Sequence, residues 1–325
     1  MYLVTGAAGF IGFHLCENLL QNKNNQVIGI DNVNNYYSTK IKKDRIKVLK
    51  KYKNFKFIKL DLNKNKEFAK IKKYKNRVET IIHLAGQAGV RYSIVNPGSY
   101  VQNNIMSYIN LLEFFKESSE IKLIIYASSS SIYGEKGSKH SVSSKPQINP
   151  ISVYSASKLS MELISKAYNY LYQIKFIGVR FFSVYGPWGR PDMFYYKFLD
   201  KLKAKKPIEI YNYGNHYRSF TYIDDVVLNL EKIINKFKLK KKKICEVFNI
   251  GNPSSIKLNK FISLLEKKLG KKAKKRYIKK HKADLLITKC NVIREKRIFD
   301  HSITVDLKSG LDNLIEWYKS YYKWF

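Results

Sequence analysis

The stretch 4-VTGAAGFIGFHL-15 decides the fold, because it sets Gly6, Gly9 and Gly12 between a short apolar run and an amphipathic segment. Glycine is needed where a chain turns sharply, approaches a pyrophosphate closely, or packs a helix against a strand. A helix that begins here also presents free N–H groups and a partial positive charge to a phosphate. The spacing is GxxGxxG rather than GxGxxG, and three glycines alone could simply form turns, so the surrounding pattern has to decide.

Short apolar runs alternate with amphipathic segments around and beyond these glycines. We expect buried strands at residues 1–5, 26–31, 55–61, 80–85, 122–128 and 175–180, because these runs are brief and rich in β-branched or aromatic residues. Helical spacing predicts helices at 11–21, 39–51, 67–74, 100–118 and 153–171. This regular alternation predicts the α/β class, with a Rossmann-type doubly wound parallel sheet whose two faces are covered by helices.

The second expected strand ends at Asp31, nineteen positions beyond Gly12. An acidic side chain at this place can hydrogen-bond the adenosine ribose hydroxyls and would repel a 2′-phosphate. No arginine follows it directly, so the pattern favours NAD over NADP as cofactor. Residues of the loops along the same sheet edge are further candidates for cofactor contacts, although each could belong to an ordinary loop: Phe10, Ile11, Asn32, Asp61, Leu62, Leu84, Ala85 and Gly86.

After residue 180 the regular alternation of strands and helices ends. Prolines and glycines separate shorter elements, with helices expected at 192–204, 224–237, 257–269 and 307–322. We therefore predict an NAD-binding Rossmann domain over 1–180, with later segments recrossing into it, and a smaller C-terminal α/β substrate domain over 181–325.

A catalytic group is predicted where 154-YSASK-158 begins a helix, because Tyr154 and Lys158 then share one face. A phenol is a poor base at neutral pH, and a nearby ammonium would lower its pKa. A Tyr–Lys pair at this spacing is common on protein surfaces, but here it follows the fifth parallel strand of a dinucleotide fold. That strand ends in 126-YASSSSIYG-134, from which we select Ser129 as the hydroxyl that relays a proton to Tyr154.

Composition restricts the other classes of function. The formal net charge of +36 is spread along nearly every polar stretch, and no helix-turn-helix, zinc or RNA-binding motif accompanies it, so we expect a solvated basic surface and no nucleic-acid partner. Cys16, Cys245 and Cys290 are widely scattered, which argues against a disulfide framework or a metal site and favours the cytoplasm. No signal peptide or membrane-length apolar run is apparent, so no membrane association is expected.

Taken together, the motifs resemble the extended short-chain dehydrogenase/reductase family over nearly the whole chain. The family motifs in this sequence are TGAAGFIG (5–12), IDNVNNYY (30–37), HLAGQAGVRYS (83–93), YASSSSIYG (126–134), YSASK (154–158), RFFSVYGPWGRPDM (180–193) and RSFTYIDD (218–225). Within the family, QAGVRYS and GPWGRPDM are similar to the UDP-glucuronate 4-epimerases.

The resemblance implies an isomerase that uses tightly bound NAD. Tyr154, assisted by Ser129, would remove the 4-hydroxyl proton while NAD⁺ takes the C4 hydride. The 4-keto sugar would then turn, and the hydride would return to its other face. It also implies substrate contacts by Gln87, Arg91, Ser129, Ser130, Ser131, Ser183, Arg190 and Arg218, with the UDP-sugar bound mainly by 181–325. Asn104 is expected near the water network or the helix of Tyr154. The kinship further implies a homodimer built on the Tyr154 helix and the helix near 100–118, and a role in polysaccharide biosynthesis.

The sequence departs from the motifs of related families at several positions, and other functions stay open as alternatives. Similar dehydratases carry an Asp–Glu pair at the positions of Ser130 and Ser131, and similar decarboxylases carry a Glu at the position of Ser131, so both reactions are disfavoured. Ser183 stands where the family commonly has Thr or Asn. In 281-HKADLL-286, Ala283 replaces a usual glycine, which puts the local phosphate or uracil contacts in doubt. A UDP-glucose or UDP-N-acetylglucosamine 4-epimerase, a UDP-glucuronate decarboxylase and a non-catalytic binding protein stay open.

Overall fold

A seven-stranded parallel sheet forms the centre of the computed structural model, which describes residues 1–135, 147–240, 243–281 and 283–324. Its strand order is β11-β6-β5-β4-β1-β2-β3. The strands are β1 (Tyr2–Thr5), β2 (Val27–Asp31), β3 (Phe55–Lys59), β4 (Thr80–His83), β5 (Leu123–Ser129), β6 (Phe176–Phe181) and β11 (Cys245–Ile250). The chain builds outward from β1 to β3 and then returns to place β4 on the other side of β1, which creates a switch point where ligands bind at the carboxyl ends of the strands. The predicted Rossmann-type sheet is confirmed.

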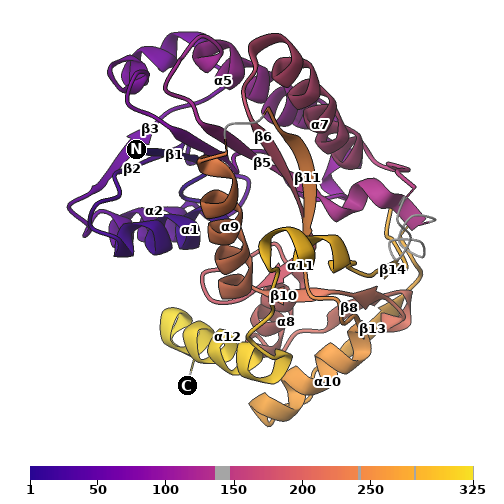
Figure 1. Cartoon of the computed structure of the whole chain (residues 1–325). Coiled ribbons are helices and arrows are strands. Elements are labelled where there is room, and N and C mark those ends of the chain that lie inside the picture. Colours follow the sequence, from indigo (N-terminus) through magenta and orange to yellow (C-terminus); the bar gives the residue numbers. More distant parts are fainter. Residues whose placement is uncertain (136–146, 241–242, 282, 325) are drawn as a thin grey trace.

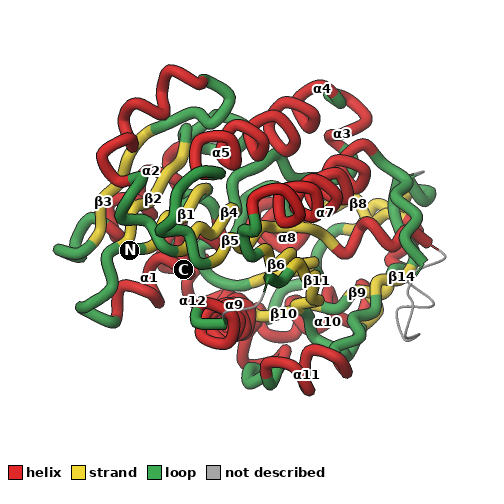
Figure 2. The backbone as a smooth tube through the Cα atoms, turned by 45° about the horizontal axis from the view of Figure 1, so that its top comes forward, coloured by secondary structure: helices red, strands yellow, loops and turns green. Residues whose placement is uncertain are grey.

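Helices cover both faces of this sheet (Figures 1 and 2). On one face lie α1 (Phe10–Gln21), α2 (Thr39–Leu49) and α9 (Ile223–Lys238), whose buried side chains share one apolar core. On the other face lie the 3-10 helix η1 (Asn65–Tyr74), α5 (Ser107–Phe115) and α7 (Val153–Tyr172), which share a second core. Because the inner strands are buried on both faces, they read as continuous apolar runs in the sequence.

The remaining segments form a smaller layer beside the carboxyl ends of the strands. Its strands are β7 (Ser183–Tyr185), β8 (Ile208–Tyr211), β9 (Tyr217–Arg218), β10 (Phe220–Tyr222), β12 (Ile256–Lys257), β13 (Lys275–Ile278) and β14 (Ile287–Thr288). Its helices are α8 (Phe194–Lys203), α10 (Leu258–Leu269), α11 (Ile293–Phe299) and α12 (Leu307–Tyr322). Two later elements lie with the first half of the chain: β11 joins the large sheet beside β6, and α9 packs on α1. The boundary at residue 180 stays a prediction.

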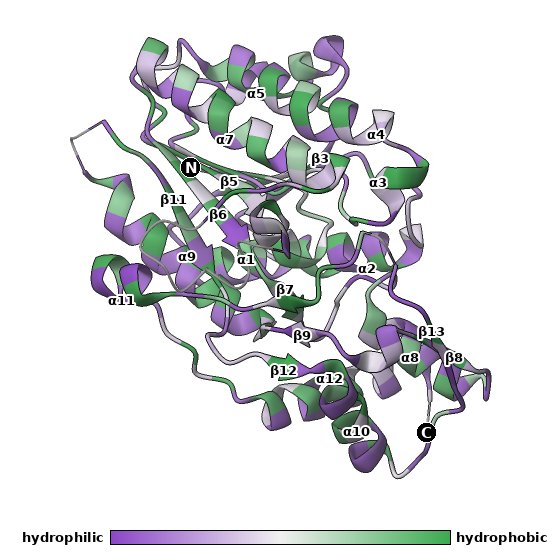
Figure 3. Cartoon of the chain, turned by 90° about the vertical axis from the view of Figure 1, so that its right-hand side faces the viewer, coloured by the Kyte–Doolittle hydropathy of each residue, from purple (hydrophilic) through white to green (hydrophobic). Residues whose placement is uncertain are grey.

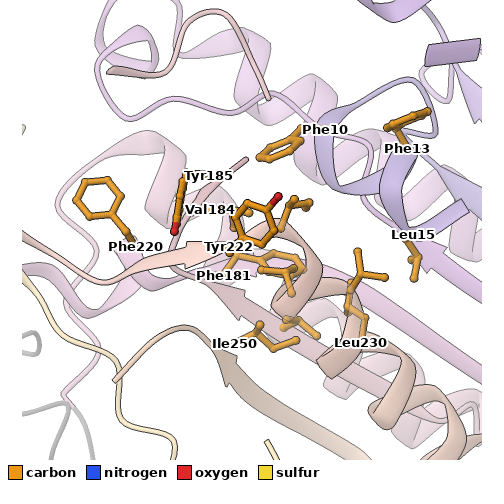
Figure 4. Close-up of a cluster of buried hydrophobic side chains, with 14 of the residues drawn as sticks. Phe10, Phe13, Leu15, Phe181, Val184, Tyr185, Phe220, Tyr222, Leu230 and Ile250 are labelled. Atoms are coloured by element: carbon orange, nitrogen blue, oxygen red, sulfur yellow. The ribbon is translucent and has the colours of Figure 1, made fainter. Parts of the chain in front are cut away.

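One apolar core joins the glycine loop to the smaller layer. Figure 4 shows Phe10, Phe13 and Leu15 of α1 facing a group of side chains from β6, β7, β10, α9 and β11. The group consists of Phe181, Val184, Tyr185, Phe220, Tyr222, Leu230 and Ile250, all of them buried. The helices at the surface show the complementary pattern, since α7, α10 and α12 carry polar and apolar residues in alternation along their length (Figure 3). The glycine loop and the smaller layer are therefore held together by one continuous apolar core.

Two expected helices differ from the sequence prediction. The segment 67–74 is a 3-10 helix, and the segment 100–118 divides into α4 (Gly98–Tyr100), the π-helical turn η2 (Val101–Met106) and α5. A π-helical turn has no signature in apolar spacing, although such turns often occur at functional sites. The short elements α3 (Tyr92–Val95), η3 (Ser130–Tyr133) and η4 (Asn212–Gly214) were also not expected. Within the described ranges, no helix combines the length and apolarity that a membrane crossing requires.

Candidate active site

A cavity of about 450 Å³ runs along the carboxyl edge of the large sheet, from the glycine loop to Arg218. Its volume lies within the range of ligand sites. The structure brings nearly all the predicted site residues together in its lining: Gly6, Gly9, Phe10, Ile11, Gly12, Asp31, Asn32, Asp61, Leu62, Leu84, Ala85, Gly86, Gln87, Ser129, Ser130, Ser131, Tyr154, Lys158, Ser183, Arg190 and Arg218. Arg91 and Asn104 are not among the lining residues.

The glycine loop has the backbone that close approach to a phosphate requires. Gly6 has a φ of +72°, a region that favours glycine. A Cβ at Gly12 would lie 2.2 Å from the carbonyl oxygen of Gly6, so no side chain fits there. Helix α1 begins at Phe10 with no side-chain cap from Gly9. The first turn can therefore offer its N–H groups to a pyrophosphate, and the loop fits a dinucleotide cofactor.

Asp31 lies beside this loop at the end of β2. Its Oδ2 accepts a hydrogen bond from the Ala8 nitrogen at 3.2 Å, and its Oδ1 accepts one from the Val33 nitrogen at 2.7 Å. Burial raises the pKa of the Asp31 carboxyl, and the charge of Lys42 opposes this rise. The carboxylate is thus fixed at the cavity wall, where the adenosine ribose of a bound cofactor would lie.

The turn at Gly86 connects the cofactor half of the cavity to α7. A Cβ at Gly86 would lie 2.6 Å from Oδ1 of Asn104, whose side chain fills the space. Asn104 accepts from the Gln87 nitrogen at 2.7 Å and donates to the Ser157 hydroxyl at 2.9 Å. Asn104 therefore contacts the helix of Tyr154, one of the two places expected for it.

Tyr154 is placed by the first turn of α7. Ser152 caps this helix, accepting from the Ser155 nitrogen at 3.1 Å, while the Ser155 hydroxyl accepts from the Ser152 nitrogen at 3.0 Å. The Tyr154 phenol lies close to the side chain of Ser129, and this interaction lowers the pKa of the phenol. The Ser129 oxygen accepts from the Ser131 nitrogen at 3.2 Å and from the Ser131 hydroxyl at 2.9 Å. Two donors thus point at the Ser129 oxygen, which leaves its own proton for Tyr154 or a ligand.

The electrostatics of Tyr154 differ from the sequence-based expectation. Burial raises the pKa of the Tyr154 phenol, whereas the Ser129 hydrogen bond and the Arg190 charge lower it. We expected this lowering from Lys158, but its Nζ donates to the Ala127 carbonyl at 2.9 Å, at the end of β5. Burial also lowers the pKa of Lys158 to about 8. The cation that acts on the phenol is therefore Arg190, which lies far from Tyr154 in the sequence.

Arg190 belongs to a loop that α2 holds against the glycine loop. The buried Arg45 of α2 donates to the carbonyls of Ala8 at 2.7 Å and Gly189 at 3.1 Å. Arg190 itself donates to both carboxylate oxygens of Asp192, at 3.0 and 2.6 Å. Its charge is thus paired within the protein, an arrangement that the sequence did not indicate.

Three charged residues surround the far end of the cavity. Arg218 donates to the backbone carbonyls of Tyr217 at 2.9 Å and Leu285 at 2.7 Å. Burial lowers the pKa of Arg218 to about 10, and the charge of Asp284 opposes this lowering. Arg91 pairs with Asp284 at 2.6 Å, and Asp284 lines the cavity. Arg91 therefore reaches the site through Asp284.

Sequence reasoning missed several residues at this site. Tyr36, Lys42 and Asp284 line the cavity, and Asp192 pairs with Arg190. Tyr36 and Asp192 stand inside motifs quoted above, IDNVNNYY and GPWGRPDM, so their place in the motifs was the available signal. Ala283, at the position that departs from the usual glycine, does face the cavity.

A Rossmann-type sheet whose glycine loop, Asp31 and Tyr154–Lys158 pair share one cavity defines a dinucleotide-binding protein of the short-chain dehydrogenase/reductase type. The NAD dependent epimerase/dehydratase family matches residues 2–251. The chain belongs to this family.

Comparisons with individual proteins agree with this assignment. An uncharacterized protein of Methanocaldococcus jannaschii is 43% identical over 324 residues, covering 99% of this chain and 97% of that protein. A UDP-glucuronate 4-epimerase of Thermodesulfobacterium geofontis is 38% identical, covering 98% of this chain and 96% of that protein. The crystal structure of UDP-glucuronic acid 4-epimerase from Bacillus cereus, in complex with UDP-glucuronic acid and NAD, has a TM-score of 0.90 and 35% identity, covering 99% of each chain.

Proposed function

We propose that this chain is an NAD-dependent isomerase that converts UDP-glucuronate to UDP-galacturonate by inverting C4. The observation that carries the proposal is that Ser129, Tyr154 and Lys158 line one cavity together with the glycine loop and the cationic Arg218. The similarity to the Bacillus cereus enzyme, whose complex contains both UDP-glucuronic acid and NAD, supports the same reaction and cofactor.

The chemistry at C4 is assigned to three residues. Bound NAD⁺ supplies an acceptor for the C4 hydride. Tyr154 takes the proton of the 4-hydroxyl and gives it back, and Ser129 relays that proton because its own hydroxyl is oriented by Ser131. Lys158 lies one helical turn from Tyr154, where its ammonium can orient the nicotinamide end of the cofactor.

Binding of the nucleotide sugar is assigned to the smaller layer of the fold, so that 181–325 serves mainly the UDP-sugar and 1–180 mainly NAD. Arg218 is the main anchor for the diphosphate, since its hydrogen bonds to described residues go to backbone carbonyls and an anion would complement its charge. Gln87, Ser130, Ser131 and Ser183 surround the place of the sugar ring, and Arg91 acts through Asp284.

A neutral-sugar 4-epimerase is the second candidate, and one specific observation favours it. The Asp192 carboxylate already pairs with Arg190, so Nε and Nη2 of this arginine are not available to a uronate carboxylate. A neutral hexose has no carboxylate and would therefore need no cation beside its C6 group.

Turnover of a substrate panel separates the two candidates. Purified protein is incubated with UDP-glucuronate, UDP-glucose or UDP-N-acetylglucosamine, and the products are separated. We expect UDP-galacturonate from the first substrate and at least a hundredfold lower kcat/KM with the other two. Brisk turnover of a neutral sugar without turnover of the uronate would establish the second candidate. Formation of UDP-xylose or a UDP-4-keto-pentose would reveal a decarboxylase.

We also propose a cytoplasmic homodimer that supplies precursors for polysaccharide biosynthesis. The dimer is supported by exposed apolar side chains on two adjacent elements, α7 and η2, namely Val153, Leu163, Tyr170, Leu171, Val101 and Met106. Light scattering should give twice the mass of one chain, and Leu163→Glu should give a monomer. A monomeric wild-type protein would exclude this part of the proposal.

A further inference from the structure

The pair formed by Arg190 and Asp192 uses one complete side of the guanidinium. Nε donates to Oδ1 of Asp192 at 3.0 Å and Nη2 donates to Oδ2 at 2.6 Å, the two-pronged geometry in which arginine binds carboxylates most strongly. Both side chains are about one-fifth exposed, so solvent screens the pair only in part. Nη1 is the edge that Asp192 does not engage.

Arg190 and Asp192 differ in their relation to the cavity. Arg190 lines the cavity together with Tyr154, whereas Asp192 is not among its lining residues. The charge of Asp192 also raises the pKa of Tyr36, which follows the Asp31 strand and lines the cavity beside the cofactor loop. The guanidinium that Asp192 holds lies near enough to Tyr154 for its charge to lower the pKa of that phenol.

We propose that Asp192 is a positioning residue that occupies the two-pronged side of Arg190, so that the carboxylate of a bound uronate meets only the Nη1 edge. This inference rests on the proposed function. Inversion at C4 requires the oxidised sugar to present its second face to a fixed cofactor, so the ring has to turn within the site. A carboxylate held by both prongs of Arg190 would resist that turn, whereas a single contact can break and re-form.

The test compares ligand affinities in a background that cannot turn substrate over. In Tyr154→Phe protein with NAD bound, the dissociation constants of UDP-glucuronate, UDP-glucose and UDP are measured by calorimetry with and without Asp192→Asn. Asn lacks the charge and the second acceptor oxygen, so the prongs of Arg190 become available. We expect UDP-glucuronate to bind about tenfold more tightly, with the constants for UDP-glucose and UDP within twofold.

Turnover then reports the consequence for the reaction. With Tyr154 intact, Asp192→Asn should lower both KM and kcat for UDP-glucuronate about tenfold, and Asp192→Glu should restore both to within threefold of wild type. Asp312→Asn, which removes an exposed carboxylate on α12, is the control for loss of one negative charge and should change neither constant.

Specific outcomes overturn the inference. The inference is contradicted if Asp192→Asn leaves the ratio of the dissociation constants of UDP-glucuronate and UDP-glucose unchanged. It is also contradicted if the affinity for all three ligands rises equally. If Asp192→Asn does not fold, Asp192→Ser gives the decision: serine also lacks the carboxylate, so UDP-glucuronate should bind about tenfold more tightly in the Tyr154→Phe background, and an unchanged dissociation constant refutes the idea. Absence of wild-type turnover of UDP-glucuronate would instead reject the proposed function, whatever the affinities show.

Discussion

Replacing Lys158 with methionine should stabilise the protein at neutral pH while abolishing its activity. Lys158 is 4% exposed, and burial lowers its pKa from 10.5 to about 8. Each unit of pKa corresponds to about 1.4 kcal/mol, so the buried ammonium costs the folded state roughly 3 kcal/mol at pH 7. The lost hydrogen bond to the Ala127 carbonyl offsets about 1 kcal/mol of this. Lys158→Met should therefore be more stable by about 2 kcal/mol at pH 7.

The pH dependence gives the sharper test of this reasoning. Because the folded-state pKa of Lys158 is the lower one, the unfolded chain binds more protons between about pH 8 and pH 10.5, and wild-type stability rises over that window. Between pH 7 and pH 9.5 the wild type should gain about 2 kcal/mol relative to the variant, so the two stabilities converge.

Urea unfolding of NAD-free protein, followed by circular dichroism at both pH values, measures the difference. Lys166→Met on the exposed side of α7 is the matched control and should stay within about 0.5 kcal/mol of wild type at either pH. A Lys158→Met protein that is less stable than wild type at pH 7, or whose advantage does not shrink at pH 9.5, would refute the reasoning.

Three further substitutions test separate parts of the site. Tyr154→Phe should keep NAD bound but lower kcat for UDP-glucuronate by at least 10³, measured by product separation; near-normal turnover would remove the phenol from the base role. Gly12→Ala places a Cβ 2.2 Å from the Gly6 carbonyl oxygen, so purified protein should contain less than a tenth of the wild-type NAD by absorbance, and full occupancy would contradict the assigned loop. Arg218→Met should raise KM for the UDP-sugar about 30-fold through loss of charge-assisted hydrogen bonds, with kcat within threefold. An unchanged KM in the Arg218→Met variant would show that the diphosphate binds at another place.

The sequence was sufficient for the elements that follow a regular period. The strands from β1 to β6 and the helix of Tyr154 lie within about two residues of their predicted positions, because buried parallel strands and amphipathic helices have strong apolar patterns. The 3-10 geometry of η1 and the π-helical turn η2 were not predictable in this way, since hydrogen-bond registers within a helix leave the apolar spacing almost unchanged.

The residues of the candidate site also fall into those that the local sequence pattern predicts and those that it does not. Residues that follow a strand or begin a helix, such as Asp31 and Tyr154, were predictable from local order alone. The pairing of Arg91 with Asp284 was not, because it depends on where loops from distant parts of the chain meet. Arg190 and Asp192 are neighbours in one loop, and their pairing depends on the conformation of that loop, which apolar spacing does not indicate. The source of the charge beside Tyr154 was misassigned for this reason. Lys158 is its sequence neighbour, but the long Lys158 side chain turns to β5, and Arg190 arrives from another loop.

The proposed reversible oxidation at C4 is tested most directly with UDP-glucuronate that carries deuterium at C4. The purified protein is incubated with this substrate in ordinary water, and the sugar nucleotides are analysed by mass spectrometry and NMR. We predict UDP-galacturonate that retains the deuterium at C4, because the hydrogen leaves and returns within one closed site. Loss of the label to water, or no UDP-galacturonate at all, would contradict the mechanism.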